Sequence, residues 1–541
     1  MIESVSTEAA PKQIALFDRR PIVSNSILIV LSLVAGAAIS YWRGQDINFD
    51  QLNYHYYIAY AYLADRLSQD VAPAQVAHSF FSPIAYLPFY IMVKNLPPYV
   101  VGMVFGALHG LNIWLVIVIS WILTPGLRTA PRVLAVIAST AISAAGPMAI
   151  SEFGTTFADI LLSPLLLAGL SLLMLGGSGE RGDLRTALAA GLAAALAGAA
   201  VSLKLTGMSF ALALAVAAVV GWTTWRSRLV ALCATAVGGL LGFAAAGGSW
   251  YLLMWRMFRN PVFPYFNDIF KSPDYDSAVP FFGIRYTPHN LWEALMYPFR
   301  WAGTQQITSE LPFRDIRFAL LIILCAIALG LAVALRARPR SAPAERRLII
   351  FFAVAFGLWM FVWSIQRYIV LLELLTGPCI LVLIRWCGLA GVRHGSKLAV
   401  AGAGLAVLCI ATVKPTDWGH LAWGKSWFSV AIPRSATEHP IYFLDGAPLA
   451  YVVPELDRQS PIVEIIAWED MRPGHDTVFV RRIKGLLANP NNEAIRVIAA
   501  SPVSASFRQS IAEYGLRVED KDCTTAAGRP YPLVWCPLVR N

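Results

Sequence analysis

Charged residues are scarce in this chain. Only 14% of its 541 residues are Asp, Glu, Lys or Arg, whereas 57% are hydrophobic and the mean hydropathy is +0.58. Soluble domains carry about 25% charged residues, so this composition excludes an ordinary soluble protein. We predict an α-helical polytopic membrane protein.

The excess of positive charge does not form a nucleic-acid surface. The formal net charge is +10, but the Lys and Arg residues lie in short clusters between apolar runs, which is where the positive-inside rule places them. The charge therefore indicates the orientation of the chain in a membrane, and no nucleic acid is expected as a partner.

Other familiar features are missing as well. The chain has no phosphate-cradling glycine sequence of the G-x-x-x-x-G-K-[ST] type, so no nucleotide is expected, and it has no convincing internal repeat of the kind seen in transporters. The first apolar run, Ile22–Trp42, follows a polar stretch and has no small-residue cleavage site after it. We expect this run to remain as a signal anchor, with residues 1–21 as a cytoplasmic segment.

Cysteine is rare, with seven residues in all. Only Cys523 and Cys536 lie in the C-terminal part of the chain, and a disulfide between them is predicted for an oxidising periplasm. Two free thiols are the alternative. The other five lie in or beside apolar runs and are typical of small buried residues: Cys233, Cys325, Cys379, Cys387 and Cys409.

Long apolar runs dominate residues 22–413. A spanning helix needs about 20 apolar residues, and by that measure the chain contains about eleven candidate transmembrane helices. They are Ile22–Trp42, Tyr99–Leu123, Arg132–Ile150, Phe157–Leu175, Thr186–Leu203, Met208–Thr223, Leu229–Tyr251, Phe318–Leu335, Leu348–Trp363, Tyr368–Ile384 and Leu398–Val413.

The basic clusters indicate how these spans alternate. Lys12, Arg19 and Arg20 precede the first span, which places the N-terminus in the cytoplasm. With that start, every later cluster falls on the cytoplasmic side: Arg128 with Arg132, Arg181 with Arg185, and the arginines and lysines within 225–228, 336–347 and 385–397. The sequence therefore predicts a multi-pass protein of a bacterial inner membrane.

Phe80–Val93 does not fit this alternation as a span. Counting it would invert everything that follows, and it is only about 14 residues long and contains Pro83 and Pro88. We predict that it is a juxtamembrane helix on the outer face.

Three segments are then expected on the outer face: 43–98, 254–317 and the tail 414–541. The tail is less apolar than the rest. It combines strand-like runs with a helical pattern at Ser504–Tyr514. The strand-like runs are Ile441–Leu444, Ala494–Ala499 and Leu533–Trp535. We predict a small periplasmic α/β domain there.

The stretch QDINFDQLNYHYYIAYAYL, residues 45–63, gathers polar groups directly after the first span. Asp46 and Asp50 are four residues apart, which on a helix would place both on one face together with Asn53. A carboxylate beside an amide and the imidazole of His55 offers a general base for a hydroxyl or amine acceptor. A solvated loop with capping acids and a belt of interfacial tyrosines is the second interpretation.

A metal site is a further option for the same stretch. Two carboxylates and one imidazole, from Asp46, Asp50 and His55, are suitable ligands for a divalent cation, but their spacing matches no defined ligand template. No cofactor is firmly predicted.

Several segments, in their order along the chain, resemble the GT-C superfamily of membrane glycosyltransferases, which use polyprenyl-phosphate-linked sugars. Asp50 in QDINFDQLNYHYY falls where that family places its acid after the first span, and SFFSPIAYLPFY is similar to its proline-bearing helix. VSLKLTG around Lys204, WYLLMWRMFRNPVFPYFN at residues 250–267 and SIQRYIVLLELL with Arg367 and Tyr368 resemble segments of bacterial members. Arg259 departs from the pattern, because a glycine is common at that position.

The resemblance implies an inverting hexosyl- or pentosyltransferase that moves a sugar from a polyprenyl-phosphate donor to a glycan, lipid or protein acceptor in the envelope, at the periplasmic face. Asp50, helped by Asp46, takes the proton from the acceptor hydroxyl. Lys204 and Arg367 hold the donor phosphate. The expected substrate-binding residues are Asn53, Tyr54, His55, Asp159, Lys204, Asn260, Arg367, Tyr368 and Glu373.

Each of these residues also has a structural interpretation. Lys204 and Arg367 could contact lipid headgroups, Asp159 could serve as a helix-start carboxylate, and Asn260 could belong only to the loop that leaves the membrane. Glu373 lies deep in its span and needs a partner or a proton; Arg367 and the substrate cavity are both candidates. A lipid or glycan transporter or flippase, and a non-catalytic envelope scaffold, remain alternative functions.

Overall fold

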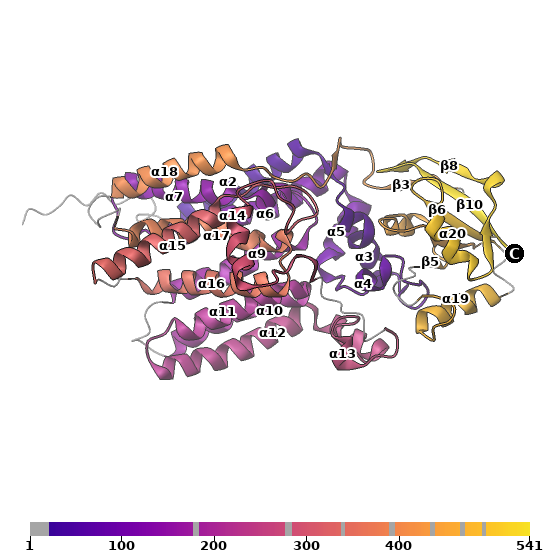
Figure 1. The fold of residues 1–541 in the computed structure, drawn as a ribbon, viewed down its shortest axis with the longest axis horizontal. Coiled ribbons are helices and arrows are strands. Elements are labelled where there is room, and N and C mark those ends of the chain that lie inside the picture. The colour runs from indigo at the N-terminus through magenta and orange to yellow at the C-terminus, as the bar shows by residue number, and fades with distance from the viewer. Residues whose placement is uncertain are drawn as a thin grey trace, which may run out of the picture.

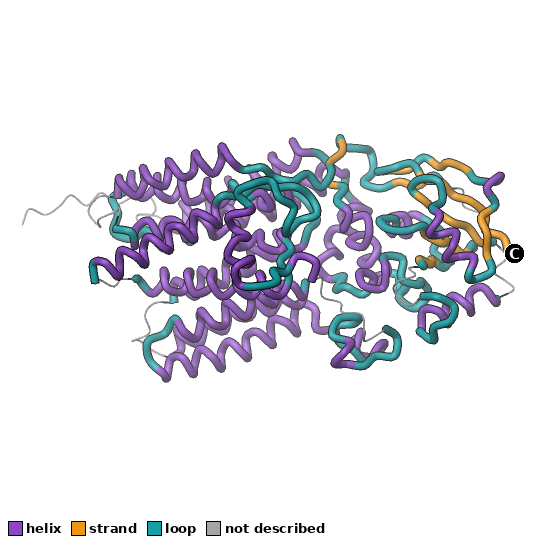
Figure 2. Tube along the Cα trace, in the orientation of Figure 1, coloured by secondary structure: helices purple, strands orange, loops and turns teal. Residues whose placement is uncertain are grey.

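The protein has three parts along its longest axis, seen in a computed structural model that describes residues 21–176, 183–275, 284–336, 341–388, 395–432, 439–465, 471–489 and 494–541. A bundle of long helices occupies one end, short helices of the first loop lie in the middle, and a domain with most of the strands occupies the other end (Figure 1). Figure 2 shows the same division between helix and strand. The predicted cytoplasmic segment 1–21 lies almost entirely outside the described residues.

The bundle has a helix at each of the eleven predicted spans. They are α2 (Pro21–Arg43), α6 (Pro98–Ile122), α7 (Thr129–Ala144), α9 (Ala158–Leu175), α10 (Asp183–Leu203), α11 (Met208–Val220), α12 (Trp225–Phe258), α15 (Arg317–Ala334), α16 (Pro343–Val362), α17 (Val370–Trp386) and α18 (Gly395–Thr412). Among the described residues, eight helices are long and apolar enough to cross a membrane, and α7 and α11 are shorter apolar helices. The predicted polytopic helical fold is confirmed.

The predicted C-terminal ends of two spans differ most from those observed. The third was expected to continue to Ile150, but α7 ends at Ala144, and Pro147 starts a separate short helix, α8 (Pro147–Ser151), because proline favours the first turn of a helix. The seventh runs on to Phe258, where Arg259 adopts a left-handed conformation (φ 55°). That conformation suits glycine, which is the residue that the resembled family commonly has there.

Small residues let α10 and α12 approach closely. A Cβ on Gly198, Gly238 or Gly242 would collide with the backbone of the facing helix, so each of these positions requires glycine. This contact fixes the end of α10, where Lys204 follows directly.

The first loop folds into β1 (Gln45–Asp46), the π-helical turn η1 (Gln51–His55), α3 (Tyr56–Leu63), α4 (Gln75–Ser79), η2 (Ile84–Tyr86) and α5 (Leu87–Asn95). A single juxtamembrane helix was predicted at Phe80–Val93, and its predicted start is wrong. Residues 80–83 form a turn after α4, and the helical segment consists of η2 followed by α5. Tyr54, Tyr56, Tyr57 and Tyr60 are buried, so they form part of the core and not an interfacial belt.

The second loop lies between α12 and α15. It contains α13 (Asn267–Phe270), η4 (Ile284–Tyr286) and α14 (Leu291–Arg300). Trp301, which follows α14, is fully buried against Phe318 of α15 and Trp359 of α16. The loop is thereby attached to the ends of these two spans.

The C-terminal part forms a mixed sheet. Its strand order is β5-β4-β6-β10-β7, with β8 also paired to β10; β4 runs parallel to β5 and β6, whereas β10 is antiparallel to β6, β7 and β8. The strands are β4 (Ile441–Leu444), β5 (Ile462–Glu464), β6 (Ile495–Ala499), β7 (Leu516–Val518), β8 (Thr524–Ala526) and β10 (Leu533–Arg540), with helices α19 (Val478–Ala488) and α20 (Ala505–Ala512).

The cysteines of this part, Cys523 and Cys536, form a disulfide with an S–S distance of 2.06 Å. In this sheet domain, sequence analysis missed α19, β5, β7 and β8.

The first loop joins this sheet directly. Val71 pairs with Val463 in a parallel bridge beside β5, with Val71 N donating to Ile462 O and Glu464 N donating to Val71 O. Arg66 binds the Asp70 carboxylate at 2.5 Å and also donates to the carbonyls of Arg458 and Ser460. Both charged side chains are only 1% exposed, so this pair ties the loop to the C-terminal domain.

We expect Arg66→Ala to lower the midpoint of thermal unfolding sharply, because it leaves the buried Asp70 carboxylate without its partner, a loss of about 3–5 kcal/mol. Arg508→Ala is the matched control, since Arg508 binds Asp520 at a similar distance of 2.6 Å but on the surface, where a pair contributes about 0–1 kcal/mol. Equal shifts for the two variants, measured in detergent micelles, would contradict this assignment.

Candidate functional site

A cavity of about 350 Å³ lies where the first loop meets the bundle. Its walls come from the first loop, the α10–α11 junction, the end of α12 with the residues that follow it, and the last turns of α16 with η5 (Gln366–Ile369). Among the described residues, the charged, hydroxyl-bearing and histidine side chains of the lining are Asp50, Tyr54, His78, Ser82, Tyr86, Lys204, Thr206, Ser209, Tyr251, Tyr265, Arg367 and Tyr368.

Asp50 and Arg367 meet in this cavity although 317 residues separate them. Arg367 Nη1 lies 2.7 Å from Asp50 Oδ2, which also accepts a hydrogen bond from Tyr54 OH at 3.0 Å. Burial alone would raise the pKa of the Asp50 carboxyl, but the Arg367 guanidinium outweighs it and holds that pKa well below its usual range. Asp50 is therefore a carboxylate at neutral pH.

Lys204 forms a second ion pair at the same cavity. It follows α10 in an extended conformation, and its Nζ lies 2.5 Å from Asp159 Oδ2 in the first turn of α9 and 4.5 Å from the centroid of the Tyr368 ring. Burial opposes the charge, yet Asp159 and nearby tyrosines raise the pKa of Lys204 above its usual value. The cavity thus contains two cations, and each is paired with a carboxylate.

His78 is a cavity residue that sequence analysis missed. Its ring stacks on Tyr54 with a centroid distance of 5.0 Å, and its Nδ1 contacts the amide of Asn53 at 3.3 Å. Burial lowers the pKa of His78 to about 4, so the ring is neutral at pH 7. Nothing in the spacing of the sequence distinguished His78 from an ordinary loop residue.

Asp46 does not share a helix face with Asp50, so that expectation was wrong. Asp46 lies in β1, where it pairs with His420 of β2 (His420–Leu421), and it does not line the cavity. Its carboxylate accepts hydrogen bonds from Asn48 N, Asn48 Nδ2, Gln51 Nε2 and Thr156 N at 2.6–3.1 Å. Burial raises the pKa of Asp46. The residue holds the start of η1 against the segment before α9, and so places Asp50.

His55 and Asn53 also lie outside the cavity lining. His55 Nδ1 contacts Thr156 Oγ1 at 2.9 Å, its ring stacks on Tyr86, and burial lowers its pKa well below the usual value. Asp46 and His55 thus both contact Thr156, whereas Asp50 binds Arg367 and Tyr54. Among the described residues, no group of three or more His, Cys, Asp or Glu side chains is arranged to hold a metal ion, so the suggested metal site is not carried forward.

Asn260, a predicted binding residue, lies in a turn and not in the cavity lining. Its Nδ2 donates to Tyr265 O at 2.9 Å and its Oδ1 accepts from Val262 N at 3.0 Å. The side chain shapes the turn after α12, which presents Val262 and Tyr265 to the cavity.

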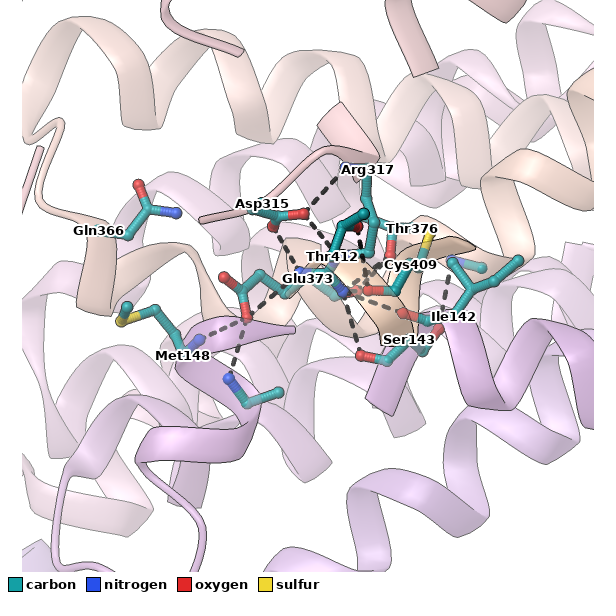
Figure 3. Close-up of polar contacts among 12 residues, drawn as sticks. Ile142, Ser143, Met148, Asp315, Arg317, Gln366, Glu373, Thr376, Cys409 and Thr412 are labelled. Carbon is teal, nitrogen blue, oxygen red and sulfur yellow. Dashed lines mark hydrogen bonds and ion pairs between the residues drawn. The ribbon is translucent and has the colours of Figure 1, made fainter. Parts of the chain in front are cut away.

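Glu373 likewise belongs to a separate polar cluster, shown in Figure 3. Its Oε2 accepts hydrogen bonds from Met148 N and Ala149 N, both at 3.0 Å, and lies 3.5 Å from Arg317 Nη2. Arg317 also binds Asp315 at 2.6 Å and donates to carbonyl oxygens of α7 and α17. The partner of Glu373 is therefore Arg317 and not Arg367, and the cluster joins α7, α8, α15 and α17.

Of the predicted site residues, the structure brings together Asp50, Tyr54, Lys204, Arg367 and Tyr368 in one cavity, with Asp159 behind Lys204. The residues that sequence analysis missed are mainly aromatic or hydroxyl-bearing. Except for His78, they lie in segments that carried the family resemblance, but nothing in the sequence marked them as cavity residues within those segments: His78, Ser82, Tyr86, Thr206, Trp250 and Tyr251.

We expect Asp46→Ala to reduce the thermal unfolding midpoint more than Asp46→Asn. The alanine leaves four buried donors without their acceptor, and each unsatisfied buried group costs about 1–3 kcal/mol, whereas asparagine keeps one carbonyl oxygen. Asp417→Ala is the control, because that carboxylate is exposed beside the same β2 strand. An unfolding midpoint for Asp46→Ala equal to that of the control would show that this carboxylate does not hold the loop.

Comparison with known proteins was informative only at the level of structure. No family model matches the chain, and no curated protein matches it by sequence. The structure is similar to that of ArnT from Cupriavidus metallidurans bound to undecaprenyl phosphate, with a TM-score of 0.51 and 14% identity over 95% of this chain and 97% of that one.

Two further solved structures are similar. The apo form of the same ArnT has a TM-score of 0.50 at 14% identity, covering 96% of this chain and 98% of that one. The Archaeoglobus fulgidus oligosaccharyltransferase in the apo form has a TM-score of 0.45 at 10% identity, covering 90% of this chain and 70% of that one. The likeness to ArnT extends over nearly the whole length of both chains, and it shows that this chain has the same overall fold as that protein.

Proposed function

We propose that this chain is an inverting glycosyltransferase that moves a sugar from a polyprenyl-phosphate donor to an acceptor of the cell envelope. The observation that carries the proposal is the convergence of Asp50, Lys204 and Arg367 on one cavity. The fold adds support, because the ArnT structure with the same architecture was solved with undecaprenyl phosphate.

The two cations are suited to the phosphate of such a donor. Lys204 is a point charge, and Arg367 offers a planar fork that matches two phosphate oxygens. The Nε of Arg367 is buried and has no hydrogen-bond acceptor among the described residues, so the fork has a donor to spare. Before the donor binds, Asp159 and Asp50 balance the two positive charges.

The apolar part of the cavity suits the prenyl chain. Leu212 of α11 and Leu358 and Val362 of α16 line it on the side of the bundle, and such side chains offer no polar group that a hydrocarbon would leave unsatisfied. A lipid placed there has its phosphate at Lys204 and its chain between the spans.

Asp50 acts as the general base in this proposal. It takes the proton of the acceptor hydroxyl while the hydroxyl oxygen forms a bond to the anomeric carbon and the bond from that carbon to the phosphate oxygen breaks. Lys204 and Arg367 stabilise the negative charge that develops on the departing lipid phosphate. A single displacement inverts the anomeric configuration.

Phosphate binding also prepares the base. Before the phosphate binds, Arg367 is paired with Asp50, and the resulting low pKa makes the Asp50 carboxylate a weak proton acceptor. When the phosphate shares the guanidinium, that stabilisation of the carboxylate weakens, and the pKa of Asp50 rises toward the range useful for catalysis. Donor binding thus precedes activation of the acceptor.

The membrane orientation is part of the proposal. With the N-terminus in the cytoplasm, the basic clusters face inward, and the cavity, the first loop and the C-terminal domain lie on the outer side of the inner membrane. A hexose or pentose donor, and a glycan, lipid or protein acceptor in the envelope, are consistent with that placement.

We expect Asp50→Asn to lower sugar transfer by about 10²–10⁴-fold, the usual contribution of a general base, while binding of undecaprenyl phosphate persists. Lys204→Gln should instead weaken that binding. Transfer is measured with membranes supplied with radiolabelled polyprenyl-phosphate hexose or pentose, and Glu513→Gln, on the exposed surface of the C-terminal domain, is the control.

Three outcomes of this experiment would reject the proposal. Transfer unchanged in Asp50→Asn would remove the base. Movement of the lipid-linked sugar across the membrane without transfer would indicate a flippase. Wild-type protein that is present in the membranes at normal levels, but that neither transfers the sugar nor binds undecaprenyl phosphate, would indicate a scaffold.

The pH dependence of kcat/KM gives a second test. Because the pKa of Asp50 is lowered in the free protein, the base is lost only as the pH falls below the ordinary aspartate value of about 3.9. In Arg367→Gln, burial acts without the compensating cation, and the acid limb should move to higher pH by about 1–3 units. A wild-type acid limb near neutrality, or no movement in the variant, would contradict the ion pair.

A further inference from the structure

Helix α14 of the second loop exposes an apolar stripe. Leu291 is 77% exposed, Trp292 is 71% exposed and Leu295 is 48% exposed. The opposite face is buried through Ala294 and Tyr297. Contiguous exposed apolar side chains on a soluble loop mark a surface that contacts something apolar.

The position of α14 indicates what that partner is. The helix packs against α15, and Trp301 at its end is buried against Phe318 in the first turn of α15 and Trp359 near the end of α16. Figure 1 shows α14 beside these spans, toward the end of the bundle that faces the first-loop helices. α14 therefore lies at the level where spans emerge from the membrane.

The exposed stripe is apolar, as is the outward-facing surface of the neighbouring spans. Ile323 of α15 is 44% exposed and Phe361 of α16 is 52% exposed, and in a multi-pass protein such side chains contact lipid. Tryptophan is enriched at the membrane–water boundary, and Arg300, at the end of α14, is 43% exposed and able to reach headgroup phosphates.

We propose that α14 is an interfacial helix whose Leu291, Trp292 and Leu295 side chains insert into the surface of the lipid bilayer. Its amphipathic pattern and its exposed flanking cation are those of a helix lying in the plane of the interface. The partner is the bilayer surface itself. This inference does not depend on the proposed enzymatic activity.

The same loop connects α14 to the cavity. After Trp301 the chain reaches Thr308, whose carbonyl accepts from Gln366 N at 2.6 Å and whose hydroxyl contacts Gln366 Oε1 at 2.8 Å. Glu310 lies 3.8 Å from Arg367. The bilayer contact of α14 is thus linked through one short segment to the turn that carries Arg367.

The test places a reporter on the stripe. In a background carrying Cys233→Ser and Cys325→Ser, which removes the two exposed free cysteines, Trp292→Cys and Leu295→Cys are labelled separately with an environment-sensitive fluorophore. The full-length protein is reconstituted into phosphatidylcholine nanodiscs with brominated or unbrominated acyl chains. Tyr531→Cys is the matched control, because it replaces an aromatic residue that is 42% exposed on the C-terminal domain.

We expect brominated lipid to quench both α14 labels several-fold more strongly than the label at position 531, with blue-shifted emission at α14 only. Quenching of the α14 labels no stronger than at position 531 would overturn the proposal. Disulfide crosslinking of Trp292→Cys between two copies, without quenching, would assign the stripe to a protein–protein contact and would overturn it equally.

Discussion

The ion pair between Asp50 and Arg367 is the interaction around which the cavity is built. One partner follows the first span and the other opens the tenth, so the pair requires the first loop and the late helices to meet. A buried ion pair contributes little net stability compared with a packed apolar contact. Under the proposed function, its presence at a cavity wall is explained by phosphate binding and base catalysis.

Two groups of buried charges among the described residues differ in exposure. The side chains of Asp50, Arg367 and Lys204 are each 13% exposed, and all three line the cavity. Arg66 with Asp70, and Arg317 with Asp315 and Glu373, are at most 1% exposed and have their remaining donors directed at backbone carbonyls. The first group is accessible to a ligand, whereas the second group joins elements to one another.

The C-terminal part supports the candidate site indirectly, through contacts with the first loop. β2 pairs with β1, Trp427 Nε1 donates to Gln51 Oε1 at 2.8 Å, and Arg529 Nη2 donates to Gln45 Oε1 at 2.8 Å. These contacts immobilise the segment on both sides of Asp46, which in turn places Asp50. The domain after α18 is consequently part of the scaffold of the first loop, even though none of its described residues lines the cavity.

The sequence by itself determined the class of protein, the positions of the long helices and the polar character of the first loop. Apolar length, the positive-inside pattern and proline breaks act locally, so they can be recognised residue by residue. It also pointed to Asp50, Lys204 and Arg367, through short motifs whose order along the chain resembles a known superfamily. It failed where a role depends on a distant partner: Asp46 and Glu373 look like Asp50 in the sequence, and their burial among backbone donors is what separates them.

Only the tertiary structure decided these assignments. It paired Arg367 with Asp50, Lys204 with Asp159 and Arg317 with Glu373, and it brought His78 to the cavity. The physical reason is that a charge in a low-dielectric interior is stabilised by whichever partner the packing of remote helices places beside it, and that packing is not encoded in the spacing of neighbouring residues.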